Sequence, residues 1–344
     1  MKGRTIVLDH VNGLEAAAYL VDGKLDDLLI DDSDAPRPGA IFRAICDRPI
    51  KGQGGMMLRL PDGETAFLRQ GKGLSPGQAM LVQVTGYSED GKAVPVTDRV
   101  LFKSRFAIVT PGKPGLNISR QIEDEDTRDE LLAVATEVHD DTFGLILRSS
   151  CEGADPEEIM DDITAMQDLA HAVLADAEGK DPEALTEGDG PHGIAWREWT
   201  GASDVVTEDG AFENLGVLDQ IDALGGALVE MGEGTMYVEP TRAMVAVDVN
   251  TGTDTSPAAA LKANLNAARE LPRQLRLRGL GGVIVMDLAS LPKKERRAFE
   301  MSLKAAFRSD PVETILAGFT PLGNYELQRH RIRVPVAEAL KGVL

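Results

Sequence analysis

Two apolar segments, each ending in an aspartate and separated by one long helix, constrain this chain more than any other feature. Met244–Val249 is a predicted strand that carries Asp248, and Gly282–Leu288 is a second that carries Asp287. Between them, Pro257–Arg278 repeats apolar residues at helical spacing and is followed by a glycine at the expected stop. This order predicts a βαβ unit. If the strands are parallel neighbours, its right-handed crossover places both carboxylates at one edge of the sheet.

Two carboxylates at one edge repel each other and favour a bound cation. One or two carboxylates with water and phosphate oxygens are the usual ligands of magnesium, so we expect Asp248 and Asp287 to bind this ion. Asn250 follows Asp248 by two residues and points to the same face, where it could add a neutral ligand or hold the attacking water. Magnesium would generate a hydroxide and offset charge on a phosphate. The alternative is that both aspartates simply accept hydrogen bonds from nearby amides.

Arginines near this unit point to a polyanionic partner. Six of them could grip a phosphate backbone, although solvated helix faces would explain them equally well: Arg269, Arg273, Arg276, Arg278, Arg329 and Arg331. The net charge of −20 does not oppose this prediction, because residues 121–238 alone carry −27 and the flanking regions are mildly basic. A basic amphipathic helix is predicted over Pro292–Phe307, and a hairpin is predicted over residues 227–238.

Short apolar runs separated by turns occupy residues 39–101 and predict a five-stranded barrel of the OB type. The runs are Ala40–Cys46, Gly55–Leu60, Thr65–Leu68, Ala79–Val84 and Ala93–Val96. Phe67 could stack a base there, or it could belong to the barrel core. Before the barrel, residues 4–8 and 16–21 are predicted strands.

The region after the barrel mixes helix and strand. Helices are predicted over Asp129–Val138 and Pro156–Ala177, with a buried strand at Gly144–Arg148 between them. The polar stretch Lys180–Gly193 is predicted to be a loop, and Trp196 is expected to pack in a core.

Composition excludes several classes of protein. With 344 residues the chain suits two or three domains, and its 43% hydrophobic content excludes wholesale disorder. It has neither a membrane-spanning apolar run nor a signal-peptide pattern, so we expect a soluble cytoplasmic protein. Cys46 and Cys151 stand apart, which excludes a zinc-finger cluster, and the five scattered histidines disfavour a zinc hydrolase.

Several segments closely resemble the catalytic region of the ribonuclease E/G family. They are Asp248–Gly252, Lys262–Ala268 and Arg273–Asp287, with Glu326–Arg331 matching a downstream Glu-Leu-x-Arg-x-Arg signature. Ala18–Gly23 and Asn117–Glu123 are weaker matches in the right order. The resemblance covers almost the whole chain.

The resemblance implies a magnesium-dependent endoribonuclease that cuts single-stranded RNA. It implies an α+β multidomain fold, in which an RNase H-like domain is interrupted by an OB-type barrel and a sensor for the RNA 5′ monophosphate. A DNase I-like α/β catalytic domain follows. The corresponding ranges are 1–35 with 194–225 for the RNase H-like domain, 36–100 for the barrel, 101–193 for the sensor region and 226–344 for the catalytic domain.

The resemblance also implies roles for individual residues. Asp248 and Asp287 would be the metal ligands, and Asn250 the accompanying polar group. Phe67 and Lys92 sit where the RNA contacts of the barrel would be. In the sensor, the Arg148 guanidinium would clamp the phosphate and the Ser149 hydroxyl would add a hydrogen bond, with Arg120 nearby in the same region.

The chain also departs from the family pattern. The two-cysteine zinc link is missing, so we expect no zinc and no zinc-linked dimer, although other oligomers stay possible. Met57 replaces a second barrel aromatic, Ser104 replaces a sensor glycine, Pro272 interrupts the long helix, and a basic residue is missing near Glu313. These departures leave open a non-catalytic RNA-binding protein of the same fold. A third, unrelated alternative is a metal-dependent phosphatase or nucleotide hydrolase.

Overall fold

The computed structural model describes residues 2–31, 35–50, 52, 54–89, 91–201 and 204–341. The chain divides into two compact units, one formed by Met1–Ser33 with Gly201–Leu344 and the other by Asp34–Thr200. The described residues form four β-sheets with helices between them, which confirms the expected mixed α+β class. The finer assignment of RNase H-like and DNase I-like domains stays a prediction.

A four-stranded sheet in the first unit contains strands from both chain segments of that unit. Its order is β14-β1-β2-β3, with β1 at Arg4–Val11, β2 at Leu14–Val21, β3 at Lys24–Ile30 and β14 at Asp204–Val206. β14 pairs parallel to β1, so strands that precede and follow the second unit in the sequence belong to one sheet. Its core also contains residues from three short helices: α4 (Ala211–Asn214), α5 (Val217–Asp222) and α8 (Val336–Ala339).

The second sheet of this unit has six strands in the order β15-β16-β17-β18-β20-β19. They are β15 Leu228–Glu230, β16 Thr235–Pro240, β17 Val245–Asn250, β18 Gly282–Asp287, β19 Thr314–Phe319 and β20 Tyr325–Arg329. β17 and β18 are parallel, and the other neighbours are antiparallel. The predicted βαβ unit and the hairpin are therefore confirmed. β19 and β20 were not expected from the sequence.

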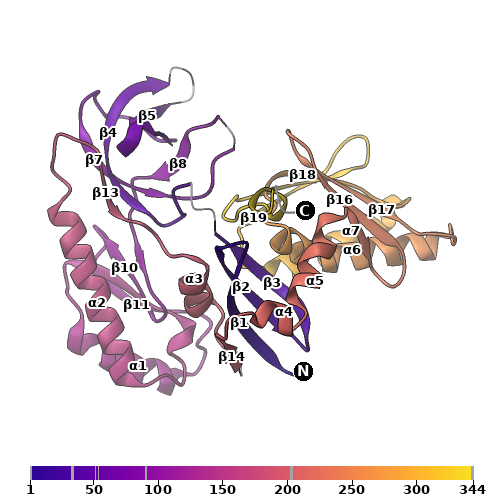
Figure 1. Ribbon diagram of the computed structural model, residues 1–344, viewed down its shortest axis with the longest axis horizontal. Coiled ribbons are helices and arrows are strands. Elements are labelled where there is room, and N and C mark those ends of the chain that lie inside the picture. Colours follow the sequence, from indigo (N-terminus) through magenta and orange to yellow (C-terminus); the bar gives the residue numbers. More distant parts are fainter. Residues whose placement is uncertain are drawn as a thin grey trace. The chain divides into compact units, whose positions relative to one another are not determined.

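Two helices pack against one face of this sheet, α6 at Pro257–Leu277 and α7 at Arg296–Arg308 (Figure 1). On α6, Ala263, Ala267 and Leu271 are buried, whereas Leu261 and Leu265 are only partly covered. The side of α6 that carries arginines faces β3 of the smaller sheet. Arg273 and Arg276 are therefore not on a solvated face, whereas Arg269 on the same side of the helix is exposed.

The second unit contains the expected barrel. Five strands close on themselves through β4–β5–β6–β8–β7 and back to β4: β4 Ile41–Ile50, β5 Gly55–Arg59, β6 Thr65–Leu68, β7 Ala79–Val84 and β8 Val94–Thr97. A further strand, β13 (Glu183–Thr186), pairs with β4. The loop predicted over 180–193 is therefore wrong at this point. The reason is tertiary, because Arg43 on β4 forms an ion pair with Glu183 and donates to the carbonyls of Asp176 and Asp181.

A four-stranded sheet completes this unit in the order β11-β12-β10-β9. Its strands are β9 Phe102–Lys103, β10 Ala107–Pro111, β11 Gly115–Ile118 and β12 Phe143–Leu147, and it shares a core with α1 (Glu125–Val138) and α2 (Pro156–Ala175). The short helix α3 spans Pro191–Glu198, and 3-10 turns lie at Pro61–Gly63, Ser149–Cys151, Ala223–Gly225 and Lys293–Glu295.

The expectation that Trp196 is a core residue is wrong. Its side chain is 58% exposed, and the Arg105 guanidinium lies 4.1 Å from its ring centroid. Among the described residues, no helix combines the length and the apolar character needed to cross a membrane.

Candidate active site

The carboxyl ends of β17 and β18 bring the two predicted metal ligands together. Asp248 and Asp287 are register partners on these parallel strands, so their backbones are separated by about one strand spacing of 4.8 Å. Both residues are exposed, while Val247, Val249 and Met286 beside them are buried in the core. The alternation of a strand therefore anchors the apolar side chains and presents both carboxylates on the uncovered face.

Asn250 lies on the same face of β17 and contacts Asp248. Its Nδ2 donates to Asp248 Oδ2 at 2.8 Å. This bond fixes the orientation of the carboxylate and occupies one of its two oxygens. Two carboxylates and an amide match the oxygen-rich, partly hydrated ligand set that magnesium prefers. No group of three or more His, Cys, Asp or Glu suited to a metal ion occurs among the residues for which coordinates are described.

Two residues that were not predicted from the sequence, Asn264 and Gly234, support this edge of the sheet. Asn264 on α6 is fully buried and donates to the carbonyl of Ala289 at 2.8 Å, which holds the loop that follows Asp287. Gly234, in the β15–β16 turn, has a φ of +79°, and an added Cβ would lie 2.6 Å from the Asn250 carbonyl oxygen. This close approach requires glycine and keeps the turn against the end of β17.

The open face around the pair is acidic. Glu239 pairs with Ala246, Ala246 pairs with Val285, and Val285 pairs with Glu326. The two glutamates therefore lie in one row across the sheet, next to the row that contains the aspartates. Glu230 lies in the row of Asn250, through its partner Thr235. All three glutamates are exposed. A cation is therefore needed before a phosphate group can approach this face closely.

Four of the six predicted RNA-binding arginines are engaged within the protein. Arg278 is 8% exposed and donates to the carbonyls of Leu224 and Gly226 at 2.7 Å. Arg273 donates to the Leu25 carbonyl and pairs with Glu270, and Arg276 and Arg329 both pair with Asp310. These groups hold the two sheets and α6 together, so the structure corrects their interpretation as a solvent-facing phosphate grip. Arg269 is exposed, and Arg331 is partly exposed with its guanidinium over Gly282.

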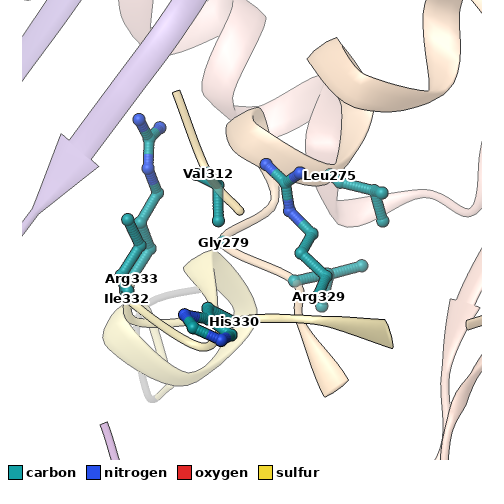
Figure 2. A pocket seen from close by; sticks show the side chains of 8 residues that line it. Leu275, Gly279, Val312, Arg329, His330, Ile332 and Arg333 are labelled. Atoms are coloured by element: carbon teal, nitrogen blue, oxygen red, sulfur yellow. The ribbon is translucent and has the colours of Figure 1, made fainter. Parts of the chain in front are cut away.

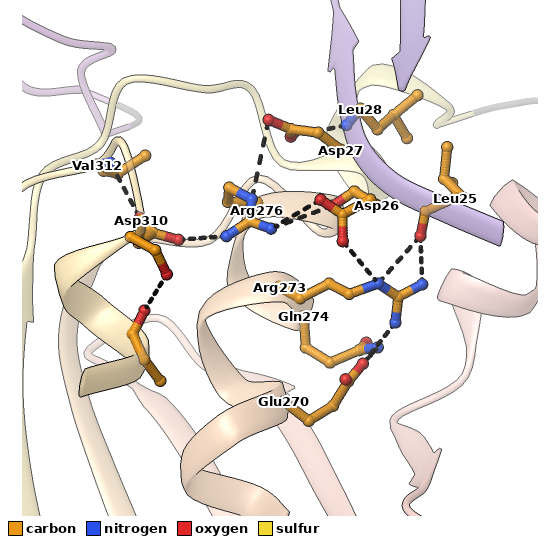
Figure 3. Close-up of polar contacts among 12 residues, drawn as sticks. Leu25, Asp26, Asp27, Leu28, Glu270, Arg273, Gln274, Arg276, Asp310 and Val312 are labelled. Atoms are coloured by element: carbon orange, nitrogen blue, oxygen red, sulfur yellow. Dashed lines mark hydrogen bonds and ion pairs between the residues drawn. The ribbon is translucent and has the colours of Figure 1, made fainter. Parts of the chain in front are cut away.

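Asp310 and Asp27 are the centres of this ion network (Figure 3). The Asp310 side chain is fully buried and lies 2.6 Å from Arg276 Nη1 and 2.9 Å from Arg329 Nη1. Asp27 binds Arg333 in a bidentate pair and also lies beside Arg276. Burial works to raise the pKa of Asp27, but the charges of Arg333 and Arg276 outweigh it and hold that pKa below its usual range.

A small pocket adjoins the same network (Figure 2). It is lined by Leu275, Gly279, Leu280, Val312, Arg329, His330, Ile332 and Arg333. Its interior has room for about one water molecule, and the buried atoms Arg329 Nη2 and Arg333 Nε have no protein partner among the described residues. The pocket suits a bound water and does not include the carboxylate pair.

A sequence model of the Ribonuclease E/G family matches residues 102–206 and 197–332, which is more than half of the chain. The chain belongs to this family. It is 27% identical to Ribonuclease G of Salmonella typhimurium over 308 residues, which are 77% of this chain and 62% of that protein. It is 28% identical to Ribonuclease E of Nostoc over 300 residues, which are 75% of this chain and 44% of that protein. The chain thus matches less than two thirds of the length of these relatives.

Two residues of the barrel, Phe67 and Lys92, are predicted RNA contacts. Phe67 is partly exposed on β6, and its ring lies over Gly55 on β5, where any Cβ would overlap it. The register places Met57 on one side of Phe67 and Pro95 on the other, which gives a short apolar row on the outside of the barrel. Lys92 is exposed and pairs with Glu89 at 2.5 Å.

The residues predicted to sense the 5′ phosphate have internal partners. Arg148 Nη1 donates to the carbonyls of Ser104, Arg105 and Arg197, and its Nη2 lies 2.7 Å from Glu198 Oε2. Burial works to raise the pKa of Glu198, but Lys103, Arg148 and Arg197 outweigh it and lower that pKa to about 2. Ser149 begins a 3-10 turn and Arg120 is exposed. A phosphate would have to compete with Glu198 for Arg148.

Proposed function

We propose that this chain is a metal-dependent endoribonuclease that cleaves single-stranded RNA, with magnesium as the ion. The observation that carries the proposal is the register pairing of Asp248 with Asp287 on an uncovered sheet face. Membership of the ribonuclease E/G family and relatives named ribonucleases support RNA as the substrate. When bound, the ion would supply an activated water and offset charge on the scissile phosphate.

The chain's own residues would position this chemistry. Asp248 and Asp287 would hold the ion, and the sheet fixes the backbones of the two strands that carry them. Asn250 orients Asp248 through the 2.8 Å hydrogen bond and leaves the other carboxylate oxygen for the ion. Arg269 and Arg331 in the first unit, and Phe67 and Lys92 in the second, are the proposed RNA contacts.

A preference for a 5′-monophosphorylated end is a separate part of the proposal. It assigns Arg148, Ser149 and Arg120 to the phosphate, with Arg148 exchanging its Glu198 contact for the ligand. The cleavage rates of one RNA with a 5′ monophosphate or a 5′ hydroxyl test it. Equal rates would show that Arg148 keeps a purely structural role.

The decisive experiment measures cleavage of a 5′-monophosphorylated, AU-rich oligonucleotide by the full chain in magnesium. Loss of a ligand should remove several kcal/mol of charge stabilisation, so Asp248→Asn and Asp287→Asn should each slow cleavage by about 10³-fold. Glu213→Gln is the control, because it removes an exposed carboxylate of the same unit from helix α4, outside the sheet that carries the pair. Calorimetric titration with Mn²⁺ should show a site in the wild type that both aspartate variants weaken.

Each outcome of this experiment has a distinct meaning. Equal cleavage by the wild type and the double variant would remove the catalytic assignment. Tight RNA binding without magnesium dependence or cleavage would favour a non-catalytic RNA-binding protein. Release of inorganic phosphate from small nucleotides would favour a phosphatase or nucleotide hydrolase.

A further inference from the structure

Beside the carboxylate pair, we infer a nucleobase-binding subsite formed by Tyr237 and Leu228. The inference rests on the proposed function and adds the part of the substrate that binds next to the scissile phosphate. Tyr237 is the register partner of Asp248, and Leu228 is the register partner of Tyr237. Together with Asp287 they form one cross-strand row over β15, β16, β17 and β18.

This row places the apolar surfaces of Tyr237 and Leu228 within the length of one nucleotide from the proposed ion. Side chains of directly opposed residues stand on the same face, so Tyr237 lies about 4.8 Å and Leu228 about 9.6 Å along the sheet from Asp248. Both side chains are accessible, with exposed fractions of 38% for Tyr237 and 43% for Leu228. A phosphodiester at the carboxylates would therefore place a flanking base over the tyrosine ring.

The charges on this face favour a base over a phosphate at that position. Glu230 and Glu239 flank Tyr237 on its own side of the sheet, and both are exposed. Their charges oppose a second phosphate beside the ring. An uncharged base is not opposed, and its aromatic face matches that of tyrosine. RNA should therefore cross β16 with a base towards the sheet and with the sugar-phosphate backbone away from the sheet.

Stacking also predicts the selectivity of the subsite. Every base offers an aromatic face, so stacking tolerates sequence, and it contributes about 1–3 kcal/mol per base. The ring supplies this contact whether or not it carries a hydroxyl. The subsite should accept any nucleobase and should respond to loss of the ring far more than to loss of the phenolic oxygen.

The experiment compares Tyr237→Leu, which removes the ring, with Tyr237→Phe, which keeps it. Tyr237→Leu should raise the KM of a short RNA by about 5- to 150-fold, the equivalent of 1–3 kcal/mol, with little change in kcat. Tyr237→Phe should stay within about twofold of the wild type. Ile315→Ala is the control, because Ile315 is exposed on the same sheet face but lies on the edge strand β19.

A second measurement locates the base and does not need cleavage. An abasic nucleotide is placed at each position near the cleavage site, and RNA affinity is measured for the wild type and Tyr237→Leu. At one position the abasic RNA should bind the wild type 5- to 150-fold more weakly and should cause no further loss in the variant. Equal affinity of the wild type and Tyr237→Leu for all RNAs would overturn the subsite. If the wild type binds RNA but never cleaves it, the proposed function fails while this binding test still decides the subsite.

Discussion

Replacing Asp310 tests whether the arginines around it hold the fold together. In the wild type, its buried carboxylate pairs with Arg276 and Arg329 and also accepts the Val312 N–H at 2.9 Å. Asp310→Ala would leave two guanidinium groups buried without this partner, with side chains only 12% and 1% exposed. Removing one member of a buried ion pair usually costs 3–5 kcal/mol, so we expect a loss of about 4 kcal/mol in the free energy of unfolding.

Hydrogen exchange measures this loss of stability in the first unit, which contains Asp310. Both tryptophans lie in the second unit, so their fluorescence does not report on the first. The slowest amides of β18 and β20 should lose about 10³-fold of their protection, since 1.4 kcal/mol corresponds to a factor of ten. Asp26→Ala makes the same change at a side chain that is 39% exposed and should cost at most about 1 kcal/mol. Similar protection in the two variants would refute the structural role of the network.

Three further predictions concern the second unit. Gly55→Val should displace the Phe67 ring and lower the free energy of unfolding of the barrel by about 1–3 kcal/mol, as urea denaturation would show, and an unchanged midpoint would contradict the packing. Because the pKa of Glu198 is lowered from 4.5 to about 2, its ion pairs should add about 3 kcal/mol of stability above pH 5 that is lost as pH falls towards 2. Glu198→Gln should flatten that part of the pH profile, and an unchanged profile would assign it to other groups. Burial raises the pKa of the Cys151 thiol to about 11, so the folded protein should react with a thiol reagent at pH 8 far more slowly than the unfolded chain, and equal rates would show that the thiol is accessible.

Local patterns predicted much of the fold. The apolar runs at Val245–Asn250 and Gly282–Asp287 and the helix between them are readable because period-2 and period-3.6 patterns depend on near neighbours in sequence. The turn-punctuated runs of the barrel are readable for the same reason. β13 was missed because its polar sequence becomes a strand by pairing with β4, more than 130 residues earlier.

The chain's own sequence determined that Asp248 and Asp287 end two apolar strands joined by a helix, and that arginines accompany them. Only the tertiary structure decided what these groups can do. The register makes the aspartates direct neighbours on an open face and adds Tyr237 to their row. Packing of α6 against β3 turns Arg273 and Arg276 inwards, so that most of the predicted phosphate grip became an internal ion network. The physical reason is that charge and spacing are properties of the sequence, whereas burial and pairing depend on segments far apart along it.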